Sequence, residues 1–215
     1  MRRRAALAVA GLLLAGCTST AVTGTGPGFP WRLAYNGYGH TSVSTQDGAT
    51  QITLQPARAT SAAQTHAALV LSRQTWPDLD AQIRLRTNQQ LRRPRPNPWE
   101  VGWILWHYTS DQRFYYIALK PNGWELGKTD PAYRGDQRYL ATATHPVFPP
   151  GRWYTVTVRQ EGAEIEVDVD GHRLVRFTDN QDPYRSGHVG LYTEDASVTF
   201  QPVTVGPFSG PAASH

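Results

Sequence analysis

The sequence predicts an all-β protein, an antiparallel β-sandwich of two sheets. Apolar and polar residues alternate over six runs, which are residues 51–54, 79–85, 101–105, 154–159, 164–169 and 198–205. A period of two is typical of strands with one buried face. No amphipathic helix pattern lies between the runs, and many short strands joined by turns indicate a sandwich or a barrel.

Turn signals separate neighbouring runs at two places where we expect tight hairpins. These are Pro121-Asn122-Gly123 and Asp170-Gly171. Asn-Gly and Asp-Gly pairs accept the positive φ of a type I′ turn, which favours a two-residue connection between antiparallel strands.

The first residues have the layout of a secretory signal. Three arginines at positions 2–4 precede an apolar run over residues 5–14, which is shorter than the roughly 20 residues that span a membrane. The string Leu14-Ala15-Gly16-Cys17, which contains the only cysteine, resembles the lipobox of bacterial lipoproteins. That resemblance implies cleavage before Cys17, lipidation of its thiol and an extracytoplasmic protein anchored in the bacterial cell envelope. An ordinary secretory signal is the alternative.

Four segments follow from this division. We expect a signal peptide over residues 1–16, a flexible tether over 17–28, the β-sandwich domain over 29–206 and a disordered tail over 207–215. Removal of the signal leaves 18 basic residues against 17 acidic ones. This balance gives no reason to expect nucleic acid as a partner, and we expect a monomer.

Three strings in the second half of the chain follow a known strand pattern. They are Gly151-Arg152-Trp153-Tyr154-Thr155-Val156-Thr157-Val158, Ile165-Glu166-Val167-Asp168-Val169-Asp170-Gly171 and Gly187-His188-Val189-Gly190-Leu191-Tyr192. They resemble the concanavalin A-like lectin/glucanase superfamily, including laminin-G-like domains. The resemblance is strongest to 3-keto-disaccharide hydrolase-type, or family 16-like, domains and covers residues 76–205. It implies a jelly roll, a fold that hosts lectins, hydrolases and lyases.

In that subgroup a central "G-I-x-x-R" strand corresponds to residues 102–106, where Trp106 replaces the arginine. The usual glycan site is the concave face of one sheet. Alternation predicts that Val101, Trp103 and Leu105 are core residues and that their neighbours point outward. The expected outward set is Glu100, Trp106, Tyr108, Tyr116, Lys120 and Glu125.

Aromatic platforms flanked by charged groups suit the apolar faces and hydroxyls of sugars. We therefore expect Trp106, Tyr108, Tyr116 and Lys120 to bind a ligand. The alternative is that a loop over residues 86–98 covers these rings and extends the core.

Glu100 and Glu125 are the candidate catalytic pair. Trp106 and Tyr108 would desolvate Glu100 and make it the acid, and Lys120 would hold Glu125 ionised as base or nucleophile. A second set, Glu164, Glu166 and Asp168, is similar to the "E-x-D-x-E" strand of family 16 hydrolases with the last two acids exchanged. Its ordinary interpretation is a solvated polar strand face.

No cofactor is expected. The seven histidines show no metal-binding spacing. Asp179, Asp182, Glu194 and Asp195 are candidates for a structural calcium site, and surface charges and Asx turns are the alternative.

The sequence thus predicts a cell-envelope lipoprotein whose sandwich binds carbohydrate. The first alternative is a glycoside hydrolase that acts on an envelope or extracellular glycan. The second is a laminin-G-like protein-interaction module.

Overall fold

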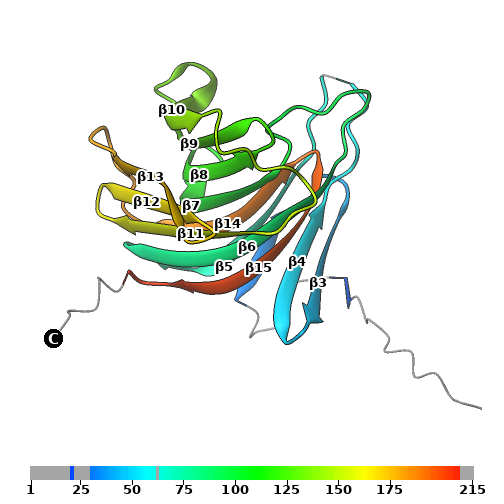
Figure 1. The fold of residues 1–215 in the computed structure, drawn as a ribbon, viewed down its shortest axis with the longest axis horizontal. Coiled ribbons are helices and arrows are strands. Elements are labelled where there is room, and N and C mark those ends of the chain that lie inside the picture. The colour runs from blue at the N-terminus through cyan, green and yellow to red at the C-terminus, as the bar shows by residue number, and fades with distance from the viewer. Residues whose placement is uncertain (1–19, 22–29, 62, 209–215) are drawn as a thin grey trace, which may run out of the picture.

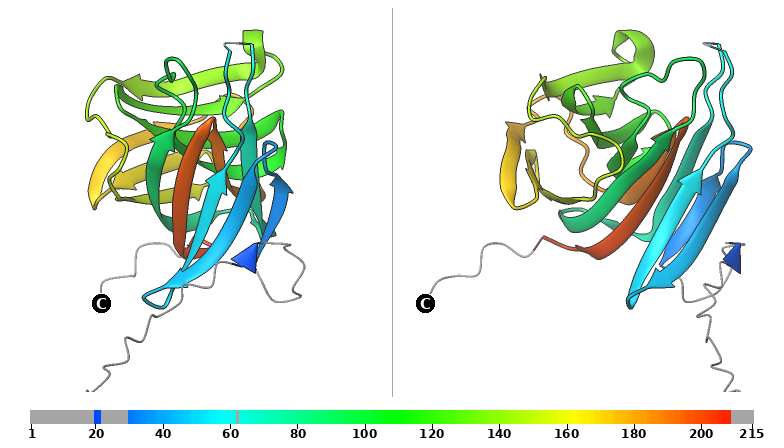
Figure 2. Two further views of the ribbon diagram at one scale, coloured as in Figure 1. Left: turned by 90° about the vertical axis from the view of Figure 1, so that its right-hand side faces the viewer. Right: turned by 45° about the vertical axis from the view of Figure 1, so that its right-hand side comes forward.

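The computed structural model describes residues 20–21, 30–61 and 63–208, and these form two packed antiparallel sheets (Figures 1 and 2). The eight-stranded sheet has the order β1 (Thr20–Ala21), β3 (His40–Gln46), β4 (Ala49–Gln55), β15 (Ala196–Gly206), β6 (Leu79–Gln90), β11 (Tyr154–Glu161), β12 (Glu164–Val169) and β13 (His172–Thr178). The seven-stranded sheet has the order β10 (Gln137–Ala143), β9 (Gly123–Thr129), β8 (Arg113–Lys120), β7 (Gly102–Ser110), β14 (Gly187–Glu194), β5 (Ala67–Trp76) and β2 (Trp31–Tyr35).

The predicted sandwich is confirmed. Within the described ranges the one helical element is a short 3₁₀ turn, Arg134–Asp136, so nothing there is a helix long and apolar enough to cross a membrane. The predicted signal peptide and Cys17 lie outside the described residues, as does most of the tether. Thr20 and Ala21, within that tether, pair with β3 as a short edge strand.

The core between the sheets is formed by the alternating apolar residues of β6, β11 and β12 on one side. Leu79, Ala81, Ile83 and Leu85 all point into it, as the sequence predicted. Both predicted hairpins are present. Asp170 and Gly171 have φ of 50° and 80°, which fits a type I′ turn. In the β8–β9 hairpin the positive φ falls on Gly123 alone, because proline fixes φ of Pro121 at a negative value.

The face prediction for β7 is wrong. Trp106 is fully buried between the sheets, where it stacks on Tyr115 and its indole N–H donates to Gln160 at 2.6 Å. Cross-strand partners share a face, and Trp106 pairs with Tyr115 whereas Leu105 pairs with Tyr116. Both faces of β7 are apolar, so alternation alone does not show which face points into the core between the sheets.

A β-bulge at His107 then resets the alternation. His107 has a φ of 48°, and the β7–β8 and β7–β14 registers both shift beside it. Gly187 packs against the His107 backbone so closely that a Cβ would overlap it. The bulge brings Tyr108 back to the outer face, in agreement with the predicted placement of that residue.

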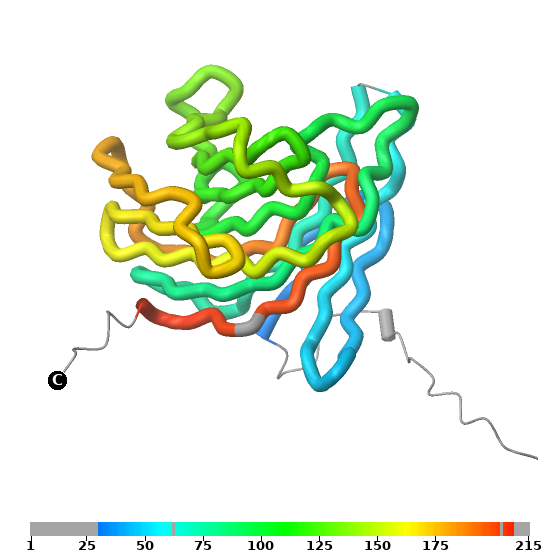
Figure 3. The backbone as a smooth tube through the Cα atoms, viewed as in Figure 1, coloured from blue at the N-terminus to red at the C-terminus, as the bar shows by residue number. Residues whose placement is uncertain are grey.

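Two long loops meet at one end of the sandwich, where the tube in Figure 3 runs cyan and green side by side. Arg92 joins them: its guanidinium forms ion pairs with Glu100 and Asp195 and donates to the Ser61 carbonyl at 2.7 Å. Arg92 is buried, whereas Arg93 and Arg95 beside it in the chain are exposed.

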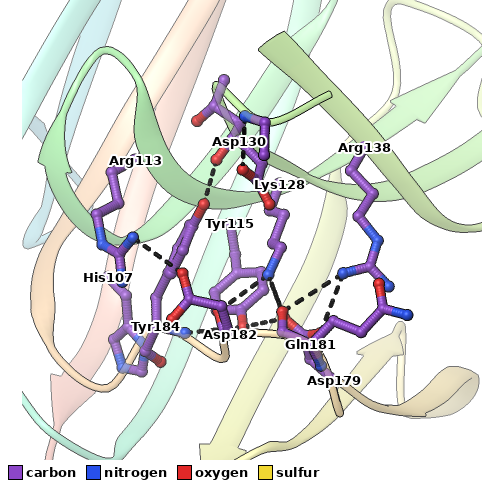
Figure 4. A network of polar contacts seen from close by, with 12 residues as sticks. His107, Arg113, Tyr115, Lys128, Asp130, Arg138, Asp179, Gln181, Asp182 and Tyr184 are labelled. Carbon is purple, nitrogen blue, oxygen red and sulfur yellow. Dashed lines mark hydrogen bonds and ion pairs between the residues drawn. The ribbon is translucent and has the colours of Figure 1, made fainter. Parts of the chain in front are cut away.

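A buried lysine holds the opposite loop, over residues 179–184, against the sheet (Figure 4). The Lys128 ammonium donates to Asp179 at 2.7 Å and to the carbonyls of Gln181 and Asp182 at 2.6 and 3.0 Å. The Tyr115 hydroxyl also donates to Asp179, at 2.6 Å. Every proton of the ammonium has an acceptor, which is the condition under which a buried charge is tolerated.

The ion pair between Lys128 and Asp179 predicts that the fold loses stability at acidic pH. Burial disfavours ionisation of Asp179, but hydrogen bonds from Lys128 and Tyr115 outweigh it and lower the Asp179 pKa. The stabilisation is therefore complete above the unfolded-state pKa of about 3.9 and is lost as pH falls through the lower folded-state pKa. Urea unfolding at pH 7 should show a loss of about 3–5 kcal/mol for Asp179→Asn, because Lys128 is left uncompensated.

The matched control is Asp182→Asn, which removes an exposed ion pair with Arg113. It should cost less than about 1 kcal/mol. Equal losses for the two variants would contradict the assigned role of Asp179.

Candidate functional site

A cleft of about 460 Å³ lies on the outer face of the seven-stranded sheet. Its lining comes from the strands β7 to β10 and β14 and from the loops between them. The lining residues are Trp99, Trp103, Asp111, Phe114, Tyr116, Glu125, Thr129, Gly135, Asp136, Gln137, Tyr139, Tyr192 and Glu194.

Stacked aromatic rings form the floor of this cleft. Trp103 lies over Tyr116 with ring centroids 4.6 Å apart and an interplanar angle of 29°, and Tyr192 meets the edge of Trp103 at 5.6 Å. Gly127, on β9, leaves room for the Tyr116 ring, since any Cβ there would overlap it. Tyr139 and Trp99 rise at the rim, 58 % and 43 % exposed. The cleft therefore offers flat apolar surface at its rim, whereas the Trp103 and Tyr116 rings beneath it are buried.

A carboxylate, an ammonium and an amide lie at one end. Glu125 forms an ion pair with Lys120 and accepts from the Tyr116 hydroxyl at 3.4 Å. The Gln137 amide donates to the same hydroxyl at 2.6 Å, and the Tyr139 hydroxyl donates to Gln137 at 3.2 Å. This network fixes the orientation of groups that can bind ligand hydroxyls.

Two further carboxyl groups, Asp111 and Glu194, also line the cleft. Asp111, in the β7–β8 turn, accepts from the Tyr108 hydroxyl at 2.8 Å and from the Tyr35 hydroxyl at 3.2 Å. Glu194, at the end of β14, accepts from the Tyr192 hydroxyl at 2.7 Å. Three tyrosines from three strands thus position two acids beside one cleft.

The two acids differ in their surroundings. Burial raises the pKa of Glu194, and the charges of Asp195 and Glu100 behind it raise it further. The Tyr192 hydrogen bond and Arg92 oppose this shift without reversing it. Asp111 instead accepts hydrogen bonds from two tyrosine hydroxyls. The cleft therefore holds one carboxyl group whose pKa is raised, Glu194, together with a second carboxyl group, Asp111.

Four of the six predicted site residues lie together at this cleft. Tyr116 and Glu125 line it, Lys120 binds Glu125, and Tyr108 binds Asp111. Tyr116 lies beneath Trp103, fully buried, so its hydroxyl rather than its ring is available to the network.

Glu100 and Trp106, the other two predicted site residues, do not line the cleft. Trp106 is in the inter-sheet core, and Glu100 is fully buried in the loop before β7, bound to Arg92 and to the Asn97 amide. The structure therefore does not bring Glu100 and Glu125 together across a ligand, and the predicted division of acid and base between them is wrong. The reversed face of β7 explains both misplacements.

Sequence reasoning missed Trp103, Tyr139, Asp111 and Glu194 as cleft residues. Trp103 carries no local signal, because its face is set only by its pairing with Ala118, two residues from Tyr116 on the outward face of β8. Asp111 and Tyr139 lie in a turn and on an irregular edge strand, where alternation gives no direction.

The remaining acidic residues that the sequence singled out are engaged in ion pairs. On β12, Glu166 and Asp168 bind Arg159 and Arg173, while Glu164 binds Arg176, which fits the polar strand face expected for this triplet. Of the four calcium candidates, Asp179 binds Lys128 and Asp195 binds Arg92. In the part of the chain that the structure describes, no three acidic, histidine or cysteine side chains gather to hold a metal ion.

Solved structures with a similar fold are numerous. A carbohydrate-binding module of family 66 from Bacillus subtilis is 14% identical, with a TM-score of 0.59 over 82% of this chain and 94% of that chain. A protein of unknown function with a galectin-like fold from Bacillus subtilis is 11% identical, with a TM-score of 0.54 over 81% and 88%. A putative glycosyl hydrolase from Parabacteroides distasonis is 12% identical, with a TM-score of 0.51 over 84% and 89%. These likenesses show the fold, a concanavalin A-like sandwich.

No curated protein sequence matches the chain significantly. A family model described as the 3-keto-alpha-glucoside-1,2-lyase-like domain matches residues 25–206. This range contains every strand of the two sheets except β1. Both the strand strings of the second half and this match lead to one conclusion: the chain belongs to the family of 3-keto-α-glucoside-1,2-lyase-like domains.

Proposed function

We propose that the protein is a cell-envelope lipoprotein that binds carbohydrate in the cleft on the seven-stranded sheet. The observation that carries this proposal is the pair of exposed rings at the rim, Trp99 and Tyr139, above a cleft lined by oriented polar groups. Sugar rings have an apolar face of C–H bonds and an edge of hydroxyls. Aromatic platforms suit the face, and carboxylates, amides and phenols suit the hydroxyls.

Family membership and fold support the same ligand class. The family description names a glucoside, and one similar structure is a carbohydrate-binding module. A laminin-G-like interaction surface is less well supported, because charged and polar groups converge inside the cleft rather than surrounding a flat apolar patch.

Tyr139→Ala tests the binding site. A glycan-array screen supplies the best-bound oligosaccharide, and isothermal titration then measures its affinity. Loss of a stacking ring should cost about 1–3 kcal/mol, or roughly 5- to 150-fold in Kd, by analogy with stacking on other flat rings. Tyr139 is exposed, so the free energy of unfolding should stay within about 0.5 kcal/mol.

Tyr38→Ala is the matched control, because Tyr38 is 91% exposed and does not line the cleft. It should leave affinity unchanged. Unchanged affinity for Tyr139→Ala would argue against binding in this cleft.

A second candidate function is cleavage of a glycosidic bond, favoured by the Asp111–Glu194 pair. Both hydrolysis and elimination need an acid that protonates the leaving oxygen as its bond to carbon breaks. Glu194 can supply that proton. Asp111 can accept a proton from water in hydrolysis or from a carbon next to a carbonyl in elimination, which leaves a carbon–carbon double bond.

If turnover is found on a glucoside or a 3-keto-glucoside, Glu194→Gln and Asp111→Asn should each lower kcat by about 10²–10⁴-fold while binding survives. Activity should fall as pH rises through the elevated Glu194 pKa, because the acid then loses its proton. Glu164→Gln, an exposed control on β12, should retain full activity. Retained activity in both cleft variants would refute the assignment.

Membrane attachment rests on the lipobox and is tested separately. Cys17→Ser should prevent lipidation, so that the protein is either released or left unprocessed when membranes are fractionated. A variant that stays with membranes and migrates like the wild type on gels would show that Cys17 is not the anchor.

A further inference from the structure

An arginine pair flanks a tryptophan on the outer face of the eight-stranded sheet, the face opposite the cleft. The guanidinium carbons of Arg84 and Arg86, on β6, lie 5.1 and 4.9 Å from the ring centroid of Trp153. Trp153 comes directly before β11, which pairs with β6 so that Tyr154 lies opposite Leu85. The strand pairing therefore brings all three side chains to one surface.

Each of the two guanidinium groups donates a hydrogen bond to a neutral side chain. Arg84 donates to the Gln201 side chain at 2.9 Å, and the Arg86 Nε donates to Asn88 at 2.8 Å. The Asn88 amide in turn donates to Thr199 at 2.9 Å, and Thr199 meets Thr53 at 3.0 Å. This chain of hydrogen bonds crosses β6, β15 and β4 and turns the Asn88 oxygen toward Arg86.

The pair keeps its charge unneutralised. Within the described residues, neither Arg84 nor Arg86 forms an ion pair with a carboxylate, whereas Arg159, Arg173 and Arg176, on β11 and β13 of the same sheet, are all paired with acids. Each anchored guanidinium uses one hydrogen-bond contact and has further N–H groups available. Two neighbouring planar guanidinium groups that have no carboxylate partner match the oxygens of carboxylate or sulfate groups.

We propose that Arg84, Arg86 and Trp153 form a second binding site, distinct from the cleft, for the carboxylate or sulfate groups of an acidic polysaccharide. The surface is open, so a single small anion would be held weakly. A polymer repeats its charged groups, so that weak single contacts add up along one chain. The two sites would let one domain contact glycan on both outer faces.

Affinity electrophoresis in gels containing polygalacturonate, dextran sulfate or neutral dextran tests this proposal. The wild-type protein should be retarded by the acidic polymers and not by dextran, and added salt should weaken the retardation. Arg84→Gln and Arg86→Gln should each weaken it by about tenfold or more, because a hydrogen-bonded charge is lost. Tyr139→Ala, in the cleft, should leave it unchanged.

Two variants separate a built site from general attraction to positive charge. Arg176→Gln removes the same charge from an exposed position on β13 and should bind like the wild type. Arg86→Lys keeps the charge but loses the planar fork and the stacking on Trp153, so it should bind more weakly. Wild-type binding by Arg86→Lys, or equal losses in Arg176→Gln, would overturn the proposal. Binding to phosphatidylglycerol vesicles or inorganic sulfate without retention by either polymer would also overturn it.

Discussion

The pairing of β7 with β8 is the constraint on which the rest of the structure depends. It places Trp106 beside Tyr115 and Leu105 beside Tyr116, so one row of side chains enters the core and the other lines the outer face. Because side chains alternate strictly, a shift by one residue would exchange the two rows. The bulge at His107 makes one such exchange locally and brings Tyr108 to Asp111. The β7–β8 register therefore determines both which side chains enter the core and which form the floor of the cleft.

Buried ion pairs secure the loops at both ends of this sheet. Lys128 with Asp179 and Arg92 with Glu100 and Asp195 each tie a loop to the strands, and each pair is surrounded by further hydrogen bonds. Such pairs contribute less to net stability than to fixing one arrangement of the chain. The second pair also affects the cleft, since Glu100 and Asp195 raise the pKa of Glu194 on the neighbouring surface.

The two outer faces of the sandwich differ in chemistry. The seven-stranded sheet presents aromatic rings and acids in a cleft, whereas the eight-stranded sheet presents the arginine pair beside Trp153. A sandwich needs only its inner faces for packing. Both outer faces are free to take up ligands, which explains why this fold supports many functions.

The sequence by itself determined the strands, the hairpins, the sandwich and the family, because period-two patterns and turn residues are local signals. It also brought Tyr108, Tyr116, Lys120 and Glu125 to one surface. Only the tertiary structure decided which face of β7 is buried, since both are apolar and only pairing with β8 distinguishes them. The partners of Glu100, the buried state of Arg92 and the placement of Asp111 and Glu194 at one cleft depend on contacts between segments far apart in the chain, which no local pattern encodes.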